Sequence, residues 1–584
     1  MKNFSVFLAV FILASITGKA EVIYLDPMPD AKYVSIENNL ILGLEYPVSE
    51  NELNNISITV TGSKSGLLRG TLKLSTDKKK IIWVKDEPFA GDETVTVSVN
   101  SGTAQISLYN SRTFSYRFQT ERSRIKVGIE STLESELGKY HIPFQTDKDP
   151  DPPEVTVITS NNPSSGKILM GIFSITPSYL LMVENTGSLF YSEELLSNCY
   201  DFKRHEDGTY TYYSKLDDKF IQLDSSLNPI DSFYCRNGYS TDLHDIIFTP
   251  SHNVLLLSYD QQIINMSLVV PNGDTAAQVT GLVIQEIDPE GNVVFQWRSW
   301  DHFEITDALH LDLTAHSIDY VHGNALDYDT DENLLLSSRH LDEITKINRS
   351  NGEIIWRLGG KNNQFEFIND TLHFTYQHDI RRIANGNITL FDNGNFHSPQ
   401  FSRAVEYHLD EINKKATLVW QYRHTPDIYG FAMGSVQRLE NGNTLIGWGY
   451  TTPTLTEVTP SGTTSLEMKL PTGSLTYRVS KAQVDNLTNI PGNNSIADKF
   501  HLAQNYPNPF NPVTSIGFSI PVSGNVILKI YDMLGREIKT LLNHYKLSGN
   551  YNILFDASDL ASGVYLYKLE AGSYTSSRKM VLIK

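Results

Sequence analysis

Short runs in which apolar and polar residues alternate, separated by polar turns, recur along the whole sequence. Residues 56–60, 81–84 and 94–99 are examples near the N-terminus. Neighbouring side chains of a strand point to opposite faces of a sheet, so a period of two predicts half-buried β-strands. Helical blocks rich in Ala, Leu and Glu are missing from the sequence. The pattern therefore predicts an all-β protein.

Within residues 160–485 the pattern repeats as a unit of four strands. One half of the unit is a pair of strands that ends near a tryptophan, as in residues 284–297 and 345–356. The other half is a hairpin that turns at a sequence such as Asn-Gly, as in residues 378–391. Four antiparallel strands in roughly 55 residues make one blade of a β-propeller, and about six blades fit this length. A solenoid is the alternative, but antiparallel strands favour radial closure. Residues 261–281 exceed the repeat and are expected to form an insertion loop.

The two ends of the chain carry further segments. Residues 1–20 contain a lysine, a short apolar run and a small-residue site, which predicts a secretory signal peptide. Residues 148–154 are rich in proline and charge, which favours an extended linker. The expected division is a signal peptide at 1–20, an immunoglobulin-like β-sandwich at 21–120, a linker at 121–159, the propeller at 160–485, a linker at 486–499 and a C-terminal β-sandwich at 500–584.

The net charge limits the possible partners of the protein, and the cysteine content limits its possible disulfides. The net charge of −19 argues against nucleic acid as a partner, because binding a polyanion requires a basic surface. The only cysteines are Cys199 and Cys235. In an oxidising compartment, a disulfide between them and two free buried thiols are both open.

Three histidines begin hairpins of the repeat: His244, His322 and His378. The first strand of each propeller blade lines the central channel, so we expect these imidazoles, at one repeated position, to surround one end of it. A metal site is one use, since neutral imidazole suits zinc, copper and iron. Nucleophilic catalysis with cationic stabilisation is the other.

The catalytic alternative requires an arginine near the histidines. Arg339 and Arg403 precede Trp356 and Trp420 by the same number of residues, so we expect them to hold equivalent places in adjacent blades. A surface or inter-blade ion pair is the competing interpretation. Arginine beside histidine is a natural receptor for a tetrahedral oxyanion such as sulfate or phosphate.

The propeller segment resembles the bacterial aryl-sulfate sulfotransferases that do not use 3′-phosphoadenosine-5′-phosphosulfate (PAPS). The segments that carry the resemblance are 244–246, 321–324, 337–339, 354–360, 376–378, 385–394 and 402–407. A glycine-rich phosphate loop opening a helix is absent from the sequence, which agrees with a donor that is not a nucleotide.

The resemblance implies a ping-pong transfer of a sulfuryl group from a phenolic sulfate to another phenol. His378 matches the histidine that is transiently sulfated. His244, His322 and Arg339 match the residues that bind the sulfuryl oxygens and assist the leaving phenolate. Arg403 and Asn324 are expected to contact the substrate. Neither a metal nor a cofactor is implied, and a homodimer is left open.

Residues 500–584 resemble the C-terminal sorting domain of the type IX secretion system. The resemblance rests on Tyr506-Pro507-Asn508-Pro509, on the strands that follow and on a basic end containing Arg578-Lys579. It implies transit through the periplasm, export to the cell surface or the medium, and the secretion machinery as a partner.

Two other functions compete with sulfotransfer. A propeller can serve as a non-catalytic binding or adhesion module, because the fold alone does not decide function. A metal-dependent hydrolase or lyase could use the histidines, although no carboxylate is evident among the repeated positions.

Overall fold

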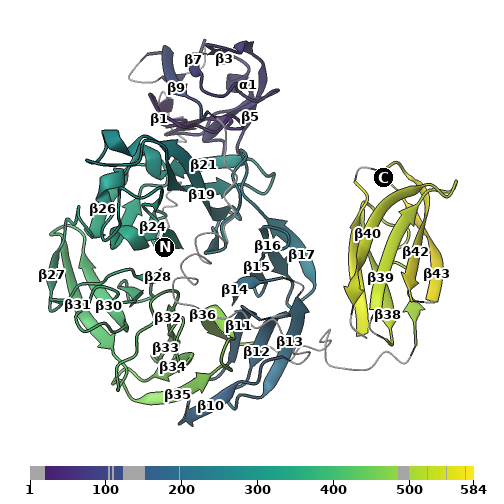
Figure 1. Cartoon of the computed structure of the whole chain (residues 1–584). Coiled ribbons are helices and arrows are strands. Elements are labelled where there is room, and N and C mark those ends of the chain that lie inside the picture. Colours follow the sequence, from purple (N-terminus) through teal and green to yellow (C-terminus); the bar gives the residue numbers. More distant parts are fainter. Residues whose placement is uncertain are drawn as a thin grey trace, which may run out of the picture.

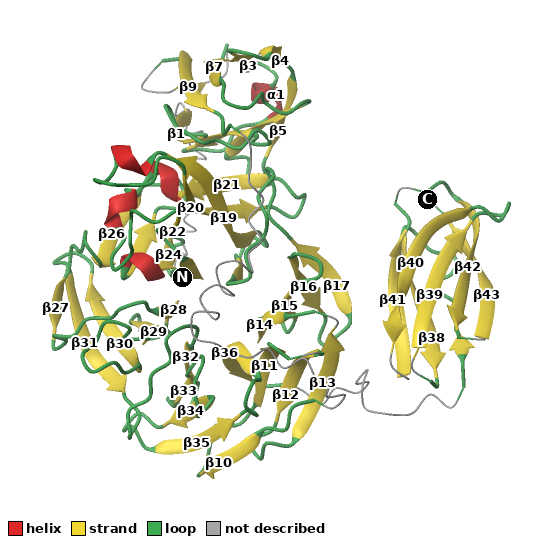
Figure 2. Cartoon of the chain, viewed as in Figure 1, coloured by secondary structure: helices red, strands yellow, loops and turns green. Residues whose placement is uncertain are grey.

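The computed structural model describes residues 20–583, apart from 103–105, 108–110, 123–151, 176, 196, 485–498, 523, 547–548, 559 and 573. The expected signal peptide, except Ala20, and most of both expected linkers lie outside the described residues. Strands form nearly all of the regular structure (Figure 2). Within the described part of the chain, the one α-helix is the short α1 (Glu50–Leu53). The expected all-β fold is confirmed.

Six sheets of antiparallel strands stand around a common centre and form the propeller (Figure 1). The first three blades, each from its inner strand outward, are blade 1 with β36 (Leu475–Ala482), β11 (Lys167–Phe173), β12 (Ser178–Val183) and β13 (Leu189–Leu195); blade 2 with β14 (Cys199–Arg204), β15 (Tyr210–Ser214), β16 (Lys219–Leu223) and β17 (Pro229–Phe233); and blade 3 with β18 (Ile246–Phe248), β19 (Val254–Ile264), β20 (Ala277–Ile287) and β21 (Val293–Arg298). The others are blade 4 with β23 (Gly323–Tyr328), β24 (Leu334–Ser338), β25 (Glu343–Ile347) and β26 (Ile354–Gly359); blade 5 with β28 (His378–Arg382), β29 (Ile388–Asp392), β30 (Arg403–Asp410) and β31 (Lys415–Tyr422); and blade 6 with β32 (Ser435–Arg438), β33 (Thr444–Gly447), β34 (Leu455–Val458) and β35 (Thr464–Lys469).

The ring is closed at both of its chain ends. The last strand, β36, pairs with β11 and so completes the first blade from the inside. The strand before the first blade, β10 (Thr156–Ser160), pairs with β35 on the outside of blade 6. Opening the ring would break two ladders of backbone hydrogen bonds at once, so this arrangement holds the inner strands in fixed positions.

The segment 261–281, which lies within blade 3, differs from the expected insertion loop. Residues 261–264 and 277–281 continue β19 and β20 in regular antiparallel register, so most of the excess is an extended hairpin. The 3-10 turn η1 (Met266–Leu268) lies at its tip. After blade 3 come η2 (Ser299–Asp301), η3 (Ile305–Asp307) and β22 (Ser317–Asp319), and β22 pairs in parallel with β20. In blade 5, β27 (Glu366–Ile368) pairs in parallel with β31.

The N-terminal sandwich has two packed sheets. Their strands are β1 (Ala20–Asp26), β2 (Leu40–Leu44), β5 (Gly70–Leu74), β6 (Lys80–Lys85) and β8 (Ile106–Ser107) in one sheet, and β3 (Ser57–Gly62), β4 (Gly66–Leu68), β7 (Thr94–Asn100) and β9 (Thr113–Gln119) in the other. The sandwich contacts blade 3 and the loop before it through buried hydrogen bonds. The Tyr24 hydroxyl donates to the carbonyl of Gln296 at 2.7 Å, and Ser35 donates to the carbonyl of Asn237 at 2.7 Å.

The C-terminal sandwich has a separate hydrophobic core that includes Ile516, Leu528 and Leu569. Its strands are β37 (His501–Leu502), β38 (Val513–Ile520) and β41 (Gly549–Asp556) in one sheet, and β39 (Gly524–Tyr531), β40 (Glu537–Lys546), β42 (Gly563–Ala571) and β43 (Tyr574–Leu582) in the other. No helix among the described residues is long and apolar enough to span a bilayer. Cys199 and Cys235 are free, buried thiols, so of the two open alternatives the structure has no disulfide between them.

Candidate active site

The three histidines come together at the inner strands of blades 3, 4 and 5. His244 and His322 lie just before β18 and β23, and His378 opens β28. All three are buried. The ring centroids of His244 and His322 are 5.3 Å apart, and the ring of Tyr477 lies 5.2 Å from that of His244 and 6.4 Å from that of His378. The expected convergence of the three imidazoles is therefore present.

His244 and His378 hold the same place relative to the pairing of the first two strands of their blades, but His322 does not, so the expectation of one position shared by all three is wrong. Tyr328 and Arg382 hold equivalent places in the first strands of blades 4 and 5, where they pair with the start of the next strand. Counted back from them, Asn324 corresponds to His378, and His322 lies earlier in the chain. His322 has a positive φ of 50°. This left-handed backbone conformation, rare for a residue with a Cβ, turns the chain just before β23.

Carboxylates hold two of the imidazoles. The Nδ1 atom of His244 lies 2.6 Å from Asp242 Oδ2, and the Nδ1 atom of His322 lies 2.7 Å from Asp319 Oδ2. Each carboxylate accepts a hydrogen bond from the Nδ1–H of its histidine, which leaves Nε2 on the other side of the ring to contact a ligand. Burial lowers the pKa of His322 against the charge of Asp319. Carboxylates are therefore part of this centre, although the sequence showed none at the repeated positions.

An amide holds the third imidazole. The Nδ1 atom of His378 lies 2.7 Å from Asn393 Oδ1. The amide nitrogen of Asn393 donates to the carbonyls of Gly430 and Met433 at 2.8 and 2.9 Å, so its oxygen is fixed towards His378. Nδ1 therefore carries the proton and Nε2 has a lone pair. Burial, followed by the positive charge of Arg339, holds the pKa of His378 well below its ordinary value.

Arg339 is the buried cation of the site. It lies in the 3-10 turn η4 (Arg339–Leu341), and its backbone N–H donates to the carbonyl of His322 at 3.0 Å. Its guanidinium donates through Nη1 to His340 Nε2 at 2.9 Å and through Nη2 to the carbonyl of Phe431 at 3.1 Å. The guanidinium carbon also lies 4.2 Å from the ring centroid of Tyr376. Such contacts orient the planar group and leave its charge next to His378.

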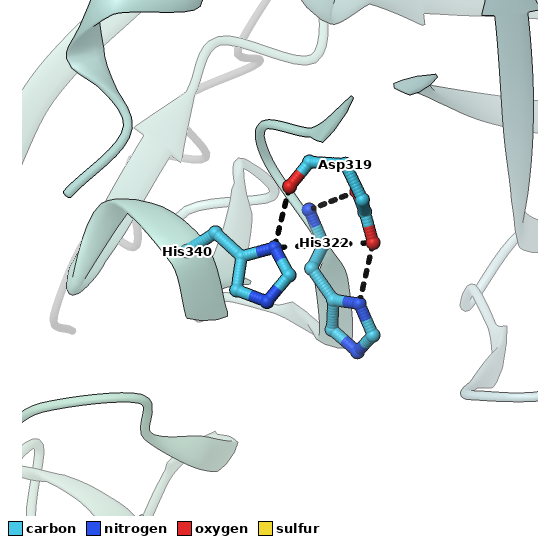
Figure 3. A group of neighbouring side chains, drawn as sticks. All are labelled: Asp319, His322 and His340. Carbon is cyan, nitrogen blue, oxygen red and sulfur yellow. Dashed lines mark hydrogen bonds and ion pairs between the residues drawn. The ribbon is translucent and has the colours of Figure 1, made fainter. Parts of the chain in front are cut away.

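Asp319, His322 and His340 are the one group of side chains in the described residues that has the spacing of metal ligands (Figure 3). Their potential ligand atoms lie within 4.8 Å of one another. The Nδ1 atoms of both histidines, however, face oxygen atoms of Asp319, and the Nε2 atom of His340 accepts from Arg339. A cation would have to displace these hydrogen bonds next to a guanidinium. The contacts therefore favour a site for an anion.

Six buried or partly buried charged side chains form a neutral network at the centre of the channel. They are Asp201, Lys203, Asp245, Asp379, Arg381 and Arg478. Arg478 donates to the carboxylate of Asp201 at 2.8 Å and to the backbone carbonyls of His244 and Asn324 at 2.7 and 2.9 Å. Burial alone would raise the pKa of Asp245, but the nearby Arg381, Arg478 and Lys203 hold it below its usual range. The network fixes the backbone beside the histidines.

The two residues expected to contact substrate have structural contacts. The Asn324 amide donates to the carbonyl of Gln377 at 2.7 Å, directly before His378. The buried Arg403 guanidinium contacts Asp392 at 2.8 Å and Asp370 at 3.0 Å. Substrate binding by Arg403 and Asn324 stays a prediction.

The expected equivalence of Arg339 and Arg403 is wrong. Arg339 lies in the turn 339–342 after β24, whereas Arg403 is the first residue of β30, after the longer loop 393–402. The residue that directly follows the second strand of blade 5, as Arg339 does in blade 4, is Asn393.

Several residues of the site escaped the sequence interpretation. Tyr477 and Arg478 come from the last strand, far along the chain from the histidines they contact, whereas Asn393 directly follows the strand that pairs with His378. Asp242 and Asp319 could have been found, because each lies within three residues of its histidine and an Asp side chain readily bonds to a backbone N–H close by.

Fold and site define a six-bladed propeller protein with a buried histidine–arginine centre and a separate C-terminal β-sandwich. The sequence profile of the arylsulfotransferase (ASST) family matches residues 154–484, and the profile of the secretion system C-terminal sorting domain matches residues 504–584. The chain belongs to the arylsulfotransferase family. Its sorting domain indicates secretion by the type IX system to the cell surface or beyond.

Similarity to individual proteins is more limited. Arylsulfate sulfotransferase AssT of Escherichia coli O6:H1 is 28% identical over 166 residues, which cover 22% of this chain and 27% of the relative. A Bacteroides caccae protein of unknown function has a TM-score of 0.35 at 12% identity, with 54% of this chain and 99% of that chain covered. For virginiamycin B lyase of Staphylococcus aureus the TM-score is 0.30 at 9% identity, with 63% and 96% covered.

Proposed function

We propose that the protein transfers a sulfuryl group from a phenolic sulfate ester to another phenol through a sulfohistidine at Nε2 of His378, without PAPS. The observation that carries this proposal is the neutral His378 ring, whose Nδ1–H donates to Asn393 and whose Nε2 is free of a proton beside Arg339. Neutral imidazole is a competent nucleophile, and transfer of a sulfuryl group resembles loose phosphoryl transfer, in which positioning and charge supply most of the catalysis.

In the first half-reaction the Nε2 lone pair of His378 forms a bond to sulfur. The bond between sulfur and the phenolic oxygen breaks, and the phenolate leaves with the electron pair. The Arg339 guanidinium stabilises the negative charge on the sulfuryl oxygens and the leaving oxygen. The product is a sulfohistidine whose ring carries a positive charge, because Nδ1 keeps its proton.

In the second half-reaction the incoming phenol loses its proton and its oxygen attacks sulfur, which returns the bonding electrons to Nε2 of His378. His322 is the group we assign as the base. Its Nε2 is available because Nδ1–H is held by Asp319, and the carboxylate stabilises the imidazolium that forms. His244, held in the same way by Asp242, donates from Nε2 to an oxygen of the same sulfuryl group when both of its ring nitrogens carry protons.

Aromatic rings beside Arg339 support an aromatic substrate. Tyr376, which lies under the guanidinium, contacts Phe396 at a centroid distance of 5.0 Å, and Phe396 stacks on His310 at 3.5 Å. Phe396 is 47% exposed. An exposed ring with a fixed orientation offers a surface on which a phenol can stack.

The test is transfer from 4-nitrophenyl sulfate to phenol, without added nucleotide or metal. We expect nitrophenol release that depends on phenol, loss of at least about a thousand-fold in His378→Ala, and an acid-labile sulfate on the His378 peptide when phenol is omitted. His408→Ala removes an exposed histidine of the same blade and should leave activity unchanged. Full activity in His378→Ala would remove the nucleophile assignment, and activity abolished by a chelator would favour a metal mechanism.

A further inference from the structure

His340 follows Arg339 in the chain. One of its ring nitrogens donates a hydrogen bond and the other accepts one. Its Nδ1 lies 2.5 Å from the backbone carbonyl of Asp319, and its Nε2 lies 2.9 Å from Arg339 Nη1. A carbonyl can only accept and a guanidinium can only donate. His340 must therefore carry its proton on Nδ1 and accept from Arg339 at Nε2, so the tautomer follows from the partners.

Asp319 serves two residues of the site at the same time (Figure 3). Its backbone carbonyl fixes His340, while its carboxylate accepts from Nδ1 of His322 at 2.7 Å and from the backbone N–H of His322 at 3.2 Å. The rings of His322 and His340 lie 4.8 Å apart. One residue thus orients the imidazole that we assign as base and, through His340, the guanidinium that faces the sulfuryl group.

The position of Asp319 is set by the segment between blades 3 and 4. Asp319 ends β22 and pairs with Thr280 of the extended hairpin. The next residue, Tyr320, is buried and donates its hydroxyl to Ser299 at 2.8 Å. Residues 299–320 are therefore held against β20 at Asp319, and the Tyr320 hydroxyl joins the two ends of this segment, which gives it a role in holding the site.

We propose that Asp319 and His340 form a positioning relay that holds Arg339 and His322 as one unit. This inference rests on the proposed sulfuryl transfer. His340 is a positioning residue, because its own nitrogens are engaged by Asp319 and Arg339. When His340 cannot accept a hydrogen bond, Nη1 of Arg339 loses a fixed partner and the guanidinium rotates away from the geometry that the transition state needs.

The test compares His340→Phe, which keeps the ring volume but has no acceptor, with His340→Gln, which has one acceptor and two donors at its end. We expect His340→Phe to lower kcat about 10- to 100-fold with KM within about threefold of the wild type, and His340→Gln to recover to within about fivefold. Thermal unfolding of both variants shows whether they fold. If His340→Phe fails to fold, the relay is tested with His340→Gln and His340→Asn. Arg339 donates to Nε2, the far nitrogen of the ring, which the longer Gln side chain matches, so His340→Gln should be more active than His340→Asn.

A double-mutant cycle with Arg339→Lys isolates the relay from a general structural effect. Arg339→Lys should lower kcat about 100-fold alone but no more than about tenfold in the His340→Phe background, because the guanidinium is already misplaced there. Independent effects that multiply, or a His340→Phe variant with the kcat of the wild type, would overturn the relay while leaving sulfuryl transfer by His378 intact. If the wild type itself shows no phenol-dependent transfer, the proposed function fails.

Discussion

The side-chain oxygen of Asn393 accepts the Nδ1 proton of His378 at 2.7 Å, in a centre where the other two imidazoles bond to carboxylates. The difference matters when the ring becomes sulfated. A carboxylate would neutralise the positive charge of the sulfohistidine, whereas a neutral amide orients the ring and leaves the charge uncompensated. The intermediate therefore stays a good sulfuryl donor for the second phenol.

Replacing this amide by a carboxylate should trap the intermediate. In Asn393→Asp we expect the first half-reaction to persist and the second to slow about 10- to 100-fold, because a buried charge pair stabilises the sulfated ring. Rapid-quench measurement of the nitrophenol burst and of the sulfated protein checks this. Asn387→Asp changes an amide elsewhere in blade 5 and is the control; equal slowing of both half-reactions in Asn393→Asp would contradict the role of the neutral amide.

The pH dependence follows from the lowered pKa of His378. Burial and the charge of Arg339 keep the folded-state pKa below the ordinary value of about 6.5. The nucleophile is therefore neutral well below pH 6.5, and the burst rate should show no acid limb near that pH. In Asn393→Asp the added carboxylate raises the pKa of His378, so an acid limb should move towards neutral pH. A limb near pH 6.5 in the wild type would contradict a neutral, desolvated nucleophile.

The same shift affects stability. The unfolded state takes up a proton at His378 below about pH 6.5, while the folded state resists protonation, so the contribution of His378 is full above that pH and is lost as the pH falls. His378→Gln removes this titration. The decrease in unfolding free energy between pH 7 and pH 5, measured by urea denaturation, should be smaller in His378→Gln than in the wild type. Identical decreases would mean that His378 protonates equally in both states.

The sequence predicted the fold class and the convergence of the histidines because both depend on local patterns. Alternation marked the strands, and first strands of propeller blades must face one axis. The predicted equivalence of Arg339 and Arg403 was wrong because loop lengths differ between blades. Counting residues back from Trp356 and Trp420 assumes equal loops, whereas the turn 339–342 is shorter than the loop 393–402. Tyr477 escaped notice because its partners are set by tertiary packing, which no nearby residue in the sequence reveals. Asn393 could have been found, because it directly follows the hairpin strand that pairs with His378.

The charge network in the channel predicts a large stability effect. Arg478→Met leaves the carboxylates of Asp201, Asp245 and Asp379 with fewer cations in a buried place. Removing one partner of a buried ion pair costs about 3–5 kcal/mol, so we expect a loss of this size in the free energy of unfolding. The control is Arg423→Met, which breaks a bidentate but exposed pair with Asp427 and should cost about 0–1 kcal/mol. Urea denaturation of the two variants gives both free energies of unfolding. Similar losses in Arg478→Met and Arg423→Met would mean that the buried network does not stabilise the fold.

Arg403 offers the decisive comparison between a structural and a substrate-binding arginine. Its guanidinium is buried and bonds to Asp392, Asp370 and the carbonyl of His373. In Arg403→Met we expect the free energy of unfolding to fall by about 3–5 kcal/mol, since two buried carboxylates lose their partner. The KM for 4-nitrophenyl sulfate, measured below the unfolding transition, should stay within about threefold of the wild type. A KM raised tenfold or more without a loss of stability would instead place Arg403 at the substrate.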